Sequence, residues 1–122
     1  MTGNEYQRLA MRTNDGESTN RLIKACSAPC KVGDIINASL GLSGEVGELN
    51  DMVKKAVFHG HPIDTNHVRK ELGDIMWYVA LMCEGFGFDL DEVIELNIAK
   101  LKARYPEGFD TERSLHRQEG DI

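Results

Sequence analysis

The sequence lacks any stretch that approaches the ~20 consecutive apolar residues of a membrane-spanning helix. Its N-terminus also lacks the basic-then-apolar pattern of an export signal. Basic residues are a minority: 14 Lys and Arg stand against 20 Asp and Glu, for a net charge of −6, whereas a nucleic-acid-binding surface needs a basic patch. We therefore expect a cytoplasmic protein that binds neither membranes nor nucleic acid.

Cysteine is scarce as well. The chain has three, and an odd number fits a reducing compartment better than a disulfide framework. Cys26 and Cys30 form a C-x3-C pair, but a zinc site usually requires a second such element, and the sequence has none. Cys83 falls within an expected helix, where packing is its simplest role. We interpret all three as free thiols and leave the role of Cys26 and Cys30 open.

The alternating pattern of β-strands is also missing, because apolar residues recur at helical spacing instead. The spacing predicts four helices, over residues 4–12, 34–58, 66–85 and 89–104. Asp34 is the expected N-cap of the first long helix, and Asp64 or Thr65 that of the second. Gly60 should form a left-handed C-cap between these two helices.

The remaining segments carry weaker patterns. Residues 13–33 are predicted to be irregular, with an ambiguous short helix around Leu22, and residues 111–122 to be a tail. Short connections make antiparallel neighbours of the long helices, which predicts an all-α antiparallel bundle of three long helices and a short N-terminal one. Residues 1–122 would form one domain with its core over about 34–110. Wide apolar stripes on so small a chain predict that a homodimer or homotetramer completes the bundle.

One motif occurs twice, since residues 45–49 (EVGEL) recur as residues 71–75 (ELGDI). Two carboxylates three residues apart project from one side of a helix, and the first acid of each motif falls within the apolar stripe. Because ionised carboxylates are costly to bury and repel one another, we expect a divalent cation between the helices. Gly47 and Gly73 each cost a helix roughly 1 kcal/mol, which indicates close approach of a second helix or a ligand.

The helix over 89–104 carries polar residues on its apolar stripe. Asn97 and Arg104 lie on the stripe, and Lys100 lies at its edge. Lys and Arg can simply extend their charged ends to solvent along an apolar surface, whereas Asn97 is too short to do so. Beside a metal site, the two cations could instead bind phosphate oxygens that the metal does not reach, and Asn97 a sugar hydroxyl or a phosphate.

Three segments in order resemble the MazG-like nucleotide pyrophosphohydrolases, a family of all-α NTP pyrophosphatases. They are the E-x-x-E of residues 45–48, the E-x-x-D of residues 71–74 and the run 97–106 (NIAKLKARYP). The resemblance covers about residues 34–110. It implies hydrolysis of a (d)NTP between the α and β phosphates, giving a monophosphate and pyrophosphate, by a homo-oligomer.

The resemblance also assigns residues to roles. It implies that Mg²⁺, with Mn²⁺ as a substitute, is bound by the four acids Glu45, Glu48, Glu71 and Asp74. It matches three further residues to positions associated with nucleotide phosphates, namely Asn97, Lys100 and Arg104. A water activated by the metal would attack, and Glu45 or Glu48 would accept its proton. The resemblance implies nothing about which base or sugar of the nucleotide is preferred.

Other functional classes fit the sequence less well. A carboxylate-bridged di-iron bundle needs Glu-x-x-His on two helices, and the sequence has none. The glycines at 41, 44 and 47 lack the Lys-Ser/Thr of a phosphate-binding P-loop. Trp77 and Tyr78 are more typical of core packing than of base stacking. A non-catalytic acidic helical module that binds a basic partner stays open as the alternative.

Overall fold

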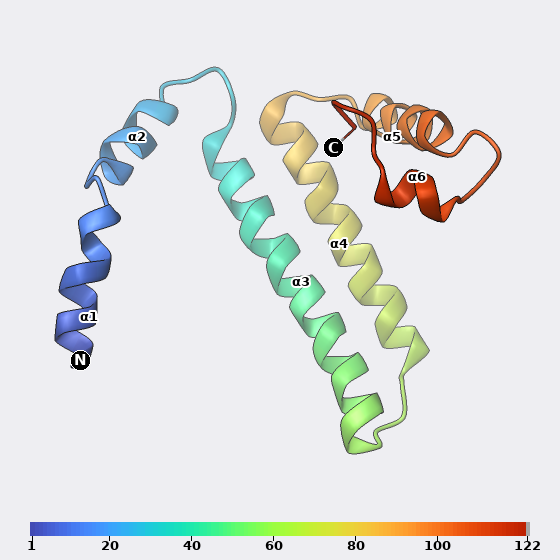
Figure 1. Cartoon of the computed structure of the whole chain (residues 1–122), viewed down its shortest axis with the longest axis horizontal. Helices are drawn as coiled ribbons and strands as arrows, with labels where there is room; N and C mark the ends of the chain where they lie inside the picture. Colours follow the sequence, from blue (N-terminus) through green and yellow to red (C-terminus); the bar gives the residue numbers. More distant parts are fainter. Residues whose placement is uncertain (122) are drawn as a thin grey trace.

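The computed structural model describes residues 1–121, which form α-helices and no β-strand (Figure 1). The elements in order are α1 (Gly3–Ala10), the 3-10 helix η1 (Met11–Thr13), α2 (Ser18–Ala25), α3 (Val32–His59), α4 (Thr65–Phe86), α5 (Leu90–Arg104) and α6 (Thr111–Leu115). The predicted all-α class and its three long helices are confirmed. No helix among residues 1–121 combines the length and apolar character that crossing a bilayer requires.

Helices α3 and α4 form an antiparallel hairpin, which is the only extensive packing between helices in the described chain. Its turn is set locally, as predicted: Gly60 has a φ of 69°, and the Asp64 side chain accepts hydrogen bonds from the backbone N–H groups of Asn66 and His67. Asp64, and not Thr65, is therefore the N-cap of α4.

The start of α3 differs from the expectation. Lys31 is its N-cap and makes no side-chain capping bond, while Asp34 lies in the first turn. The predicted cap at Asp34 is wrong because a contact distant in sequence fixes the helix start: the Lys31 backbone N–H donates to the Gly85 carbonyl at 2.9 Å, and its ammonium pairs with Glu84.

Two glycines allow α3 and α4 to approach closely. A Cβ added to Gly41 would lie 2.2 Å from Cε1 of Tyr78, and one added to Gly85 would lie 2.6 Å from Cγ1 of Ile35. At Gly47 and Gly73, by contrast, an added Cβ would meet no described atom within 4 Å beyond its chain neighbours and the backbone of its own helix. Of the two expectations for these duplicated glycines, close approach of a second helix is not seen among the described residues and occurs at Gly41 and Gly85 instead; close approach of a ligand stays a prediction.

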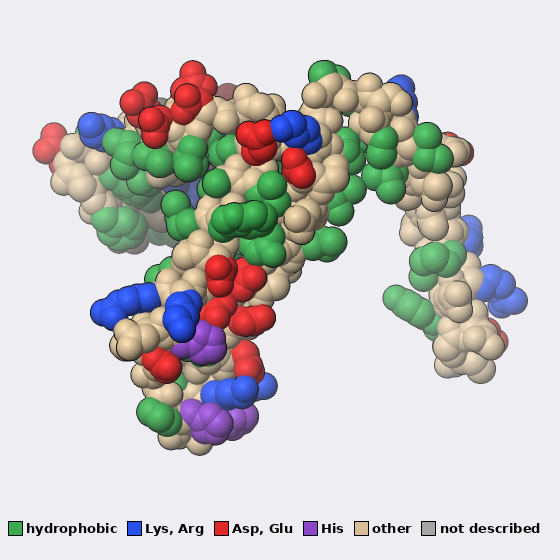
Figure 2. Space-filling view, turned by 180° about the vertical axis from the view of Figure 1, so that it is seen from behind, with side chains coloured by type: hydrophobic (Ala, Val, Ile, Leu, Met, Phe, Trp, Pro, Cys, Tyr) green, Lys and Arg blue, Asp and Glu red, His purple; other side chains and the backbone are tan. Residues whose placement is uncertain are grey.

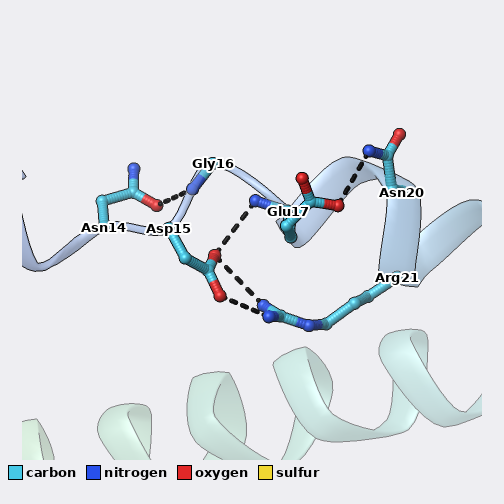
Figure 3. A network of polar contacts seen from close by, with 6 residues as sticks. All are labelled: Asn14, Asp15, Gly16, Glu17, Asn20 and Arg21. Carbon is cyan, nitrogen blue, oxygen red and sulfur yellow. Dashed lines mark hydrogen bonds and ion pairs between the residues drawn. The ribbon is translucent and has the colours of Figure 1, made fainter.

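The segments outside the hairpin contain more helix than predicted. The short helix left ambiguous around Leu22 is present as α2 over residues 18–25, while residues 111–115 form α6 within the expected tail. Asp110 caps α6 by accepting from the Arg113 N–H. Ahead of α2, Asp15 accepts from the Glu17 N–H at 3.0 Å and pairs with the guanidinium of Arg21 (Figure 3). Short-range polar contacts of this kind order the chain where these two short helices begin.

Much apolar surface stays uncovered by the chain. The accessible area is 9999 Å², whereas a compact protein of this mass exposes about 6,600 Å². Among the described residues, the only buried apolar side chains are Ala38 and Cys83, and Trp77, expected in a core, is 57% exposed. The N-terminal arm formed by α1 and α2 extends away from the hairpin, and α5 leaves it at the opposite end from the turn (Figure 1). The three cysteines are free thiols, as predicted.

Candidate metal centre

The hairpin brings three of the four predicted acids together. Glu45 from α3 and Glu71 and Asp74 from α4 each offer a carboxylate oxygen within 4.8 Å of the others. The fourth acid, Glu48, lies outside this group of three and is exposed one turn further along α3. Figure 2 shows acidic side chains gathered halfway along the hairpin, with basic and His side chains toward its turn.

The three acids have unequal surroundings. Glu71 is 5% exposed, and its Oε2 has no hydrogen-bond partner among the described residues. The pKa of Glu45 is raised, first by desolvation, then by the close approach of the Glu71 carboxyl and by the charges of the neighbouring acids. An orphaned buried oxygen amid like charges fits a hard cation, since Mg²⁺ and Ca²⁺ take carboxylate oxygens as ligands.

His67 and a shallow groove adjoin the acids. His67 Nε2 lies 2.7 Å from Oε1 of Glu71, one helical turn away on α4. The groove has a volume of about 460 Å³ and is lined by Gly44, Gly47, Glu48, Asp51, Met52, Lys55 and His67. Lys55 pairs with Asp51 at 2.6 Å. His67 was not predicted from the sequence, although it lies four residues before Glu71, a spacing that places both side chains on one side of a helix.

The predicted phosphate-binding residues lie elsewhere in the chain. The Arg104 Nε donates to Oδ2 of Asp121 at 2.6 Å, and its NH2 pairs with the other oxygen; the two side chains are only 12% and 17% exposed. This pairing raises the pKa of Arg104 and lowers that of Asp121. Lys100 and Arg104 line an open cavity of about 650 Å³ together with residues from 110–121, and none of the four acids contributes to it. Asn97 is exposed on α5.

One chain therefore does not join the acids with Asn97, Lys100 and Arg104. The physical reason lies at the end of α4, where Gly87 adopts a φ of 71° and Asp89 caps α5. The chain turns there, and α5 makes no packing with α3 or α4 comparable to that within the hairpin.

Comparison with known proteins identifies the family to which this chain belongs. The sequence model of the MazG nucleotide pyrophosphohydrolase domain matches residues 36–109, a range that contains all four acids and Asn97, Lys100 and Arg104. The "Gene 37 protein" of Mycobacterium phage L5 is 36% identical over 74 residues, which are 57% of this chain and 65% of the phage protein, so the chain spans less than two thirds of that relative. No solved structure matches. The chain belongs to the MazG nucleotide pyrophosphohydrolase domain family.

Proposed function

We propose that the protein is a Mg²⁺-dependent nucleoside triphosphate pyrophosphohydrolase of the cytoplasm, which releases pyrophosphate and a nucleoside monophosphate by cleaving the α–β bond. Mn²⁺ would substitute for Mg²⁺. The observation that carries the proposal is the convergence of Glu45, Glu71 and Asp74, with the buried Oε2 of Glu71 unpartnered, inside the matched domain.

Each acid has a proposed role. Glu45, Glu71 and Asp74 hold the cation, as their oxygens lie within 4.8 Å of one another. When bound, a divalent cation neutralises phosphate charge and lowers the pKa of a bound water. Glu48 is exposed, lines the groove and lies outside the group of three. We assign to it the acceptance of the proton from the attacking water, in addition to the ligand role that the resemblance gives it.

The phosphate-binding residues are proposed to come from a second copy of the chain, in a homodimer or homotetramer. Lys100 and Arg104 share no cavity with the acids of their own chain, and the uncovered apolar surface favours association. The Arg104 guanidinium already binds the Asp121 carboxylate through two donors. The same fork geometry suits a phosphate, which would have to displace Asp121. Asn97 would contact a sugar hydroxyl or a phosphate.

Phosphorus NMR of a panel of nucleoside triphosphates with Mg²⁺ tests the reaction directly. We expect a monophosphate and intact pyrophosphate, no accumulation of diphosphate, and no turnover in excess chelator. Glu71→Gln should fold normally and lose activity at least ~100-fold, because it removes a charged ligand oxygen. Glu95→Gln is the matched control, since Glu95 is an exposed acid of α5 outside the cluster, and it should retain full activity.

Other products or no products would contradict the proposal. Inorganic phosphate and a nucleoside diphosphate as first products would make the protein an ordinary triphosphatase. A folded protein that hydrolyses no member of the panel would favour the non-catalytic acidic module instead.

A further inference from the structure

His67 differs from an ordinary surface histidine in what it contacts. Its Nε2 lies 2.7 Å from Oε1 of Glu71, whose side chain is only 7% exposed, while the imidazole itself is 51% exposed. The chain contains a second His–Glu pair of the same i, i+4 spacing, His116 with Glu112. There the atoms are 3.5 Å apart and both side chains are 78% exposed. The His67 contact is thus closer and is made to a buried side chain.

The two oxygens of Glu71 are consequently in different situations. Oε1 contacts the imidazole, whereas Oε2 is buried and has no hydrogen-bond partner among the described residues. An ionised carboxylate oxygen can only accept, so a favourable contact at this distance requires an N–H at Nε2 of the imidazole. The terminal torsion of a glutamate is broad, and a fixed donor on one oxygen restricts it.

We propose that His67 is a positioning residue for Glu71: by engaging Oε1, it directs the buried Oε2 toward the cation held with Glu45 and Asp74. This inference rests on the proposed function, because it supposes that the acid cluster binds a metal. Carboxylates that ligate metals are oriented by such outer partners, and removing the partner typically weakens metal binding 10- to 100-fold. His67 also lines the groove beside Glu48, so it belongs to the same side of the hairpin as the proposed site.

Mn²⁺ is the probe for the test, because EPR of the free aquo ion gives the dissociation constant without any need for turnover. We expect His67→Ala to weaken Mn²⁺ binding about ten-fold. His67→Gln should restore it to within about three-fold, since the Gln Nε2 amide carries a donor at a similar reach. His116→Ala should leave Mn²⁺ affinity unchanged. Melting temperatures in chelator should agree among all four proteins, because an i, i+4 pair adds little to folding.

The outcomes separate the positioning role from its alternatives. Unchanged Mn²⁺ affinity in His67→Ala would overturn the proposal. So would a directly bound ¹⁴N coupling in pulsed EPR of the wild type that disappears in His67→Ala, because His67 would then be a ligand. A wild type that binds no Mn²⁺ would overturn both this proposal and the metal site. Affinities that change as expected, in a protein that hydrolyses no nucleotide, would support the positioning role and reject the proposed function alone.

Discussion

The four predicted acids differ chiefly in their exposure to solvent. Glu71 is buried, Glu45 is half-buried, and Glu48 and Asp74 are exposed. Burial and like charge both disfavour ionisation, so the metal-free site opposes folding to a degree that depends on pH. A cation reverses this effect only if it binds the native state and not the unfolded chain.

The pKa of Glu45 determines in which direction the stability of the metal-free protein changes with pH. Its folded-state pKa is raised above the ordinary value of 4.5. The native state therefore binds this proton more tightly than the unfolded chain does, and the resulting stability is fully present below pH 4.5 and lost as the pH rises through the folded-state pKa. In chelator, Glu45→Gln should be more stable than wild type at pH 7, and the difference should shrink as the pH falls toward 4.5.

Urea unfolding at a series of pH values measures this difference. Saturating Mg²⁺ at pH 7 should reverse its sign, because the wild type then gains ligand-binding free energy that the variant lacks. A difference that stays constant from pH 4.5 to pH 7 in chelator would show that the carboxyl of Glu45 titrates normally.

At the scale of elements, the hairpin is defined at its turn by local signals and along its length by two close contacts. Gly60 and Asp64 end α3 and begin α4. Gly41 accommodates the Tyr78 ring, and Gly85 accommodates Ile35. These contacts set the separation of the two helices and hence the convergence of Glu45 on Glu71.

Substitutions at Gly41 and Gly44 should act in opposite directions. Gly41→Ala should lower the free energy of unfolding by about 1–3 kcal/mol, because the new Cβ would overlap the Tyr78 ring. Gly44→Ala, three residues along the same helix with no atom within 4 Å of its added Cβ, should raise it by about 0.5–1 kcal/mol. Denaturation in chelator measures the free energy of unfolding of each metal-free variant. Equal effects of the two substitutions would contradict the packing seen at Tyr78.

At the scale of the whole molecule, two features of the single chain favour association under the proposed function. The chain leaves far more surface exposed than a compact protein of its mass, and it separates the acid cluster from the cations of α5. A standard protein interface covers about 800 Å² on each partner, well below the excess of exposed area. Under the proposed function, association of identical chains would cover apolar surface and bring the cations of one chain to the acids of another.

Mixed oligomers test whether the site is shared. Glu71→Gln and Arg104→Ala should each be nearly inactive alone. Co-expressed, they should recover about a quarter of wild-type activity in a dimer, because half of the dimers are mixed and each mixed dimer holds one complete site. The pair Glu71→Gln with Glu45→Gln is the control and should recover none, since both acids act within one chain. Absence of recovery in the first mixture, or full activity from a stable monomer in light scattering, would locate the whole site in a single chain.

Much of the site was predictable from sequence because it depends on spacing within helices. Acids at 45, 48, 71 and 74 fall at helical intervals on segments whose periodicity is unambiguous, and Gly60 marks the turn that makes those segments antiparallel. Helical hydrogen bonds join residues four apart, so near neighbours in the sequence determine them. The helix α6 escaped prediction because a polar cap begins it and no long apolar stripe follows.

Contacts between residues distant in the chain were decided only by the tertiary structure. Apolar periodicity placed Glu71 on an inward face, but the packing of α3 on α4 buried it and left its Oε2 unpartnered. The same packing selected Gly41 and Gly85, and not Gly47 and Gly73, for close approach. The pairing of Arg104 with Asp121 depends on how the chain folds back after α5. Sequence spacing fixes which side of a helix a residue occupies; the shapes of the facing surfaces fix what that side meets.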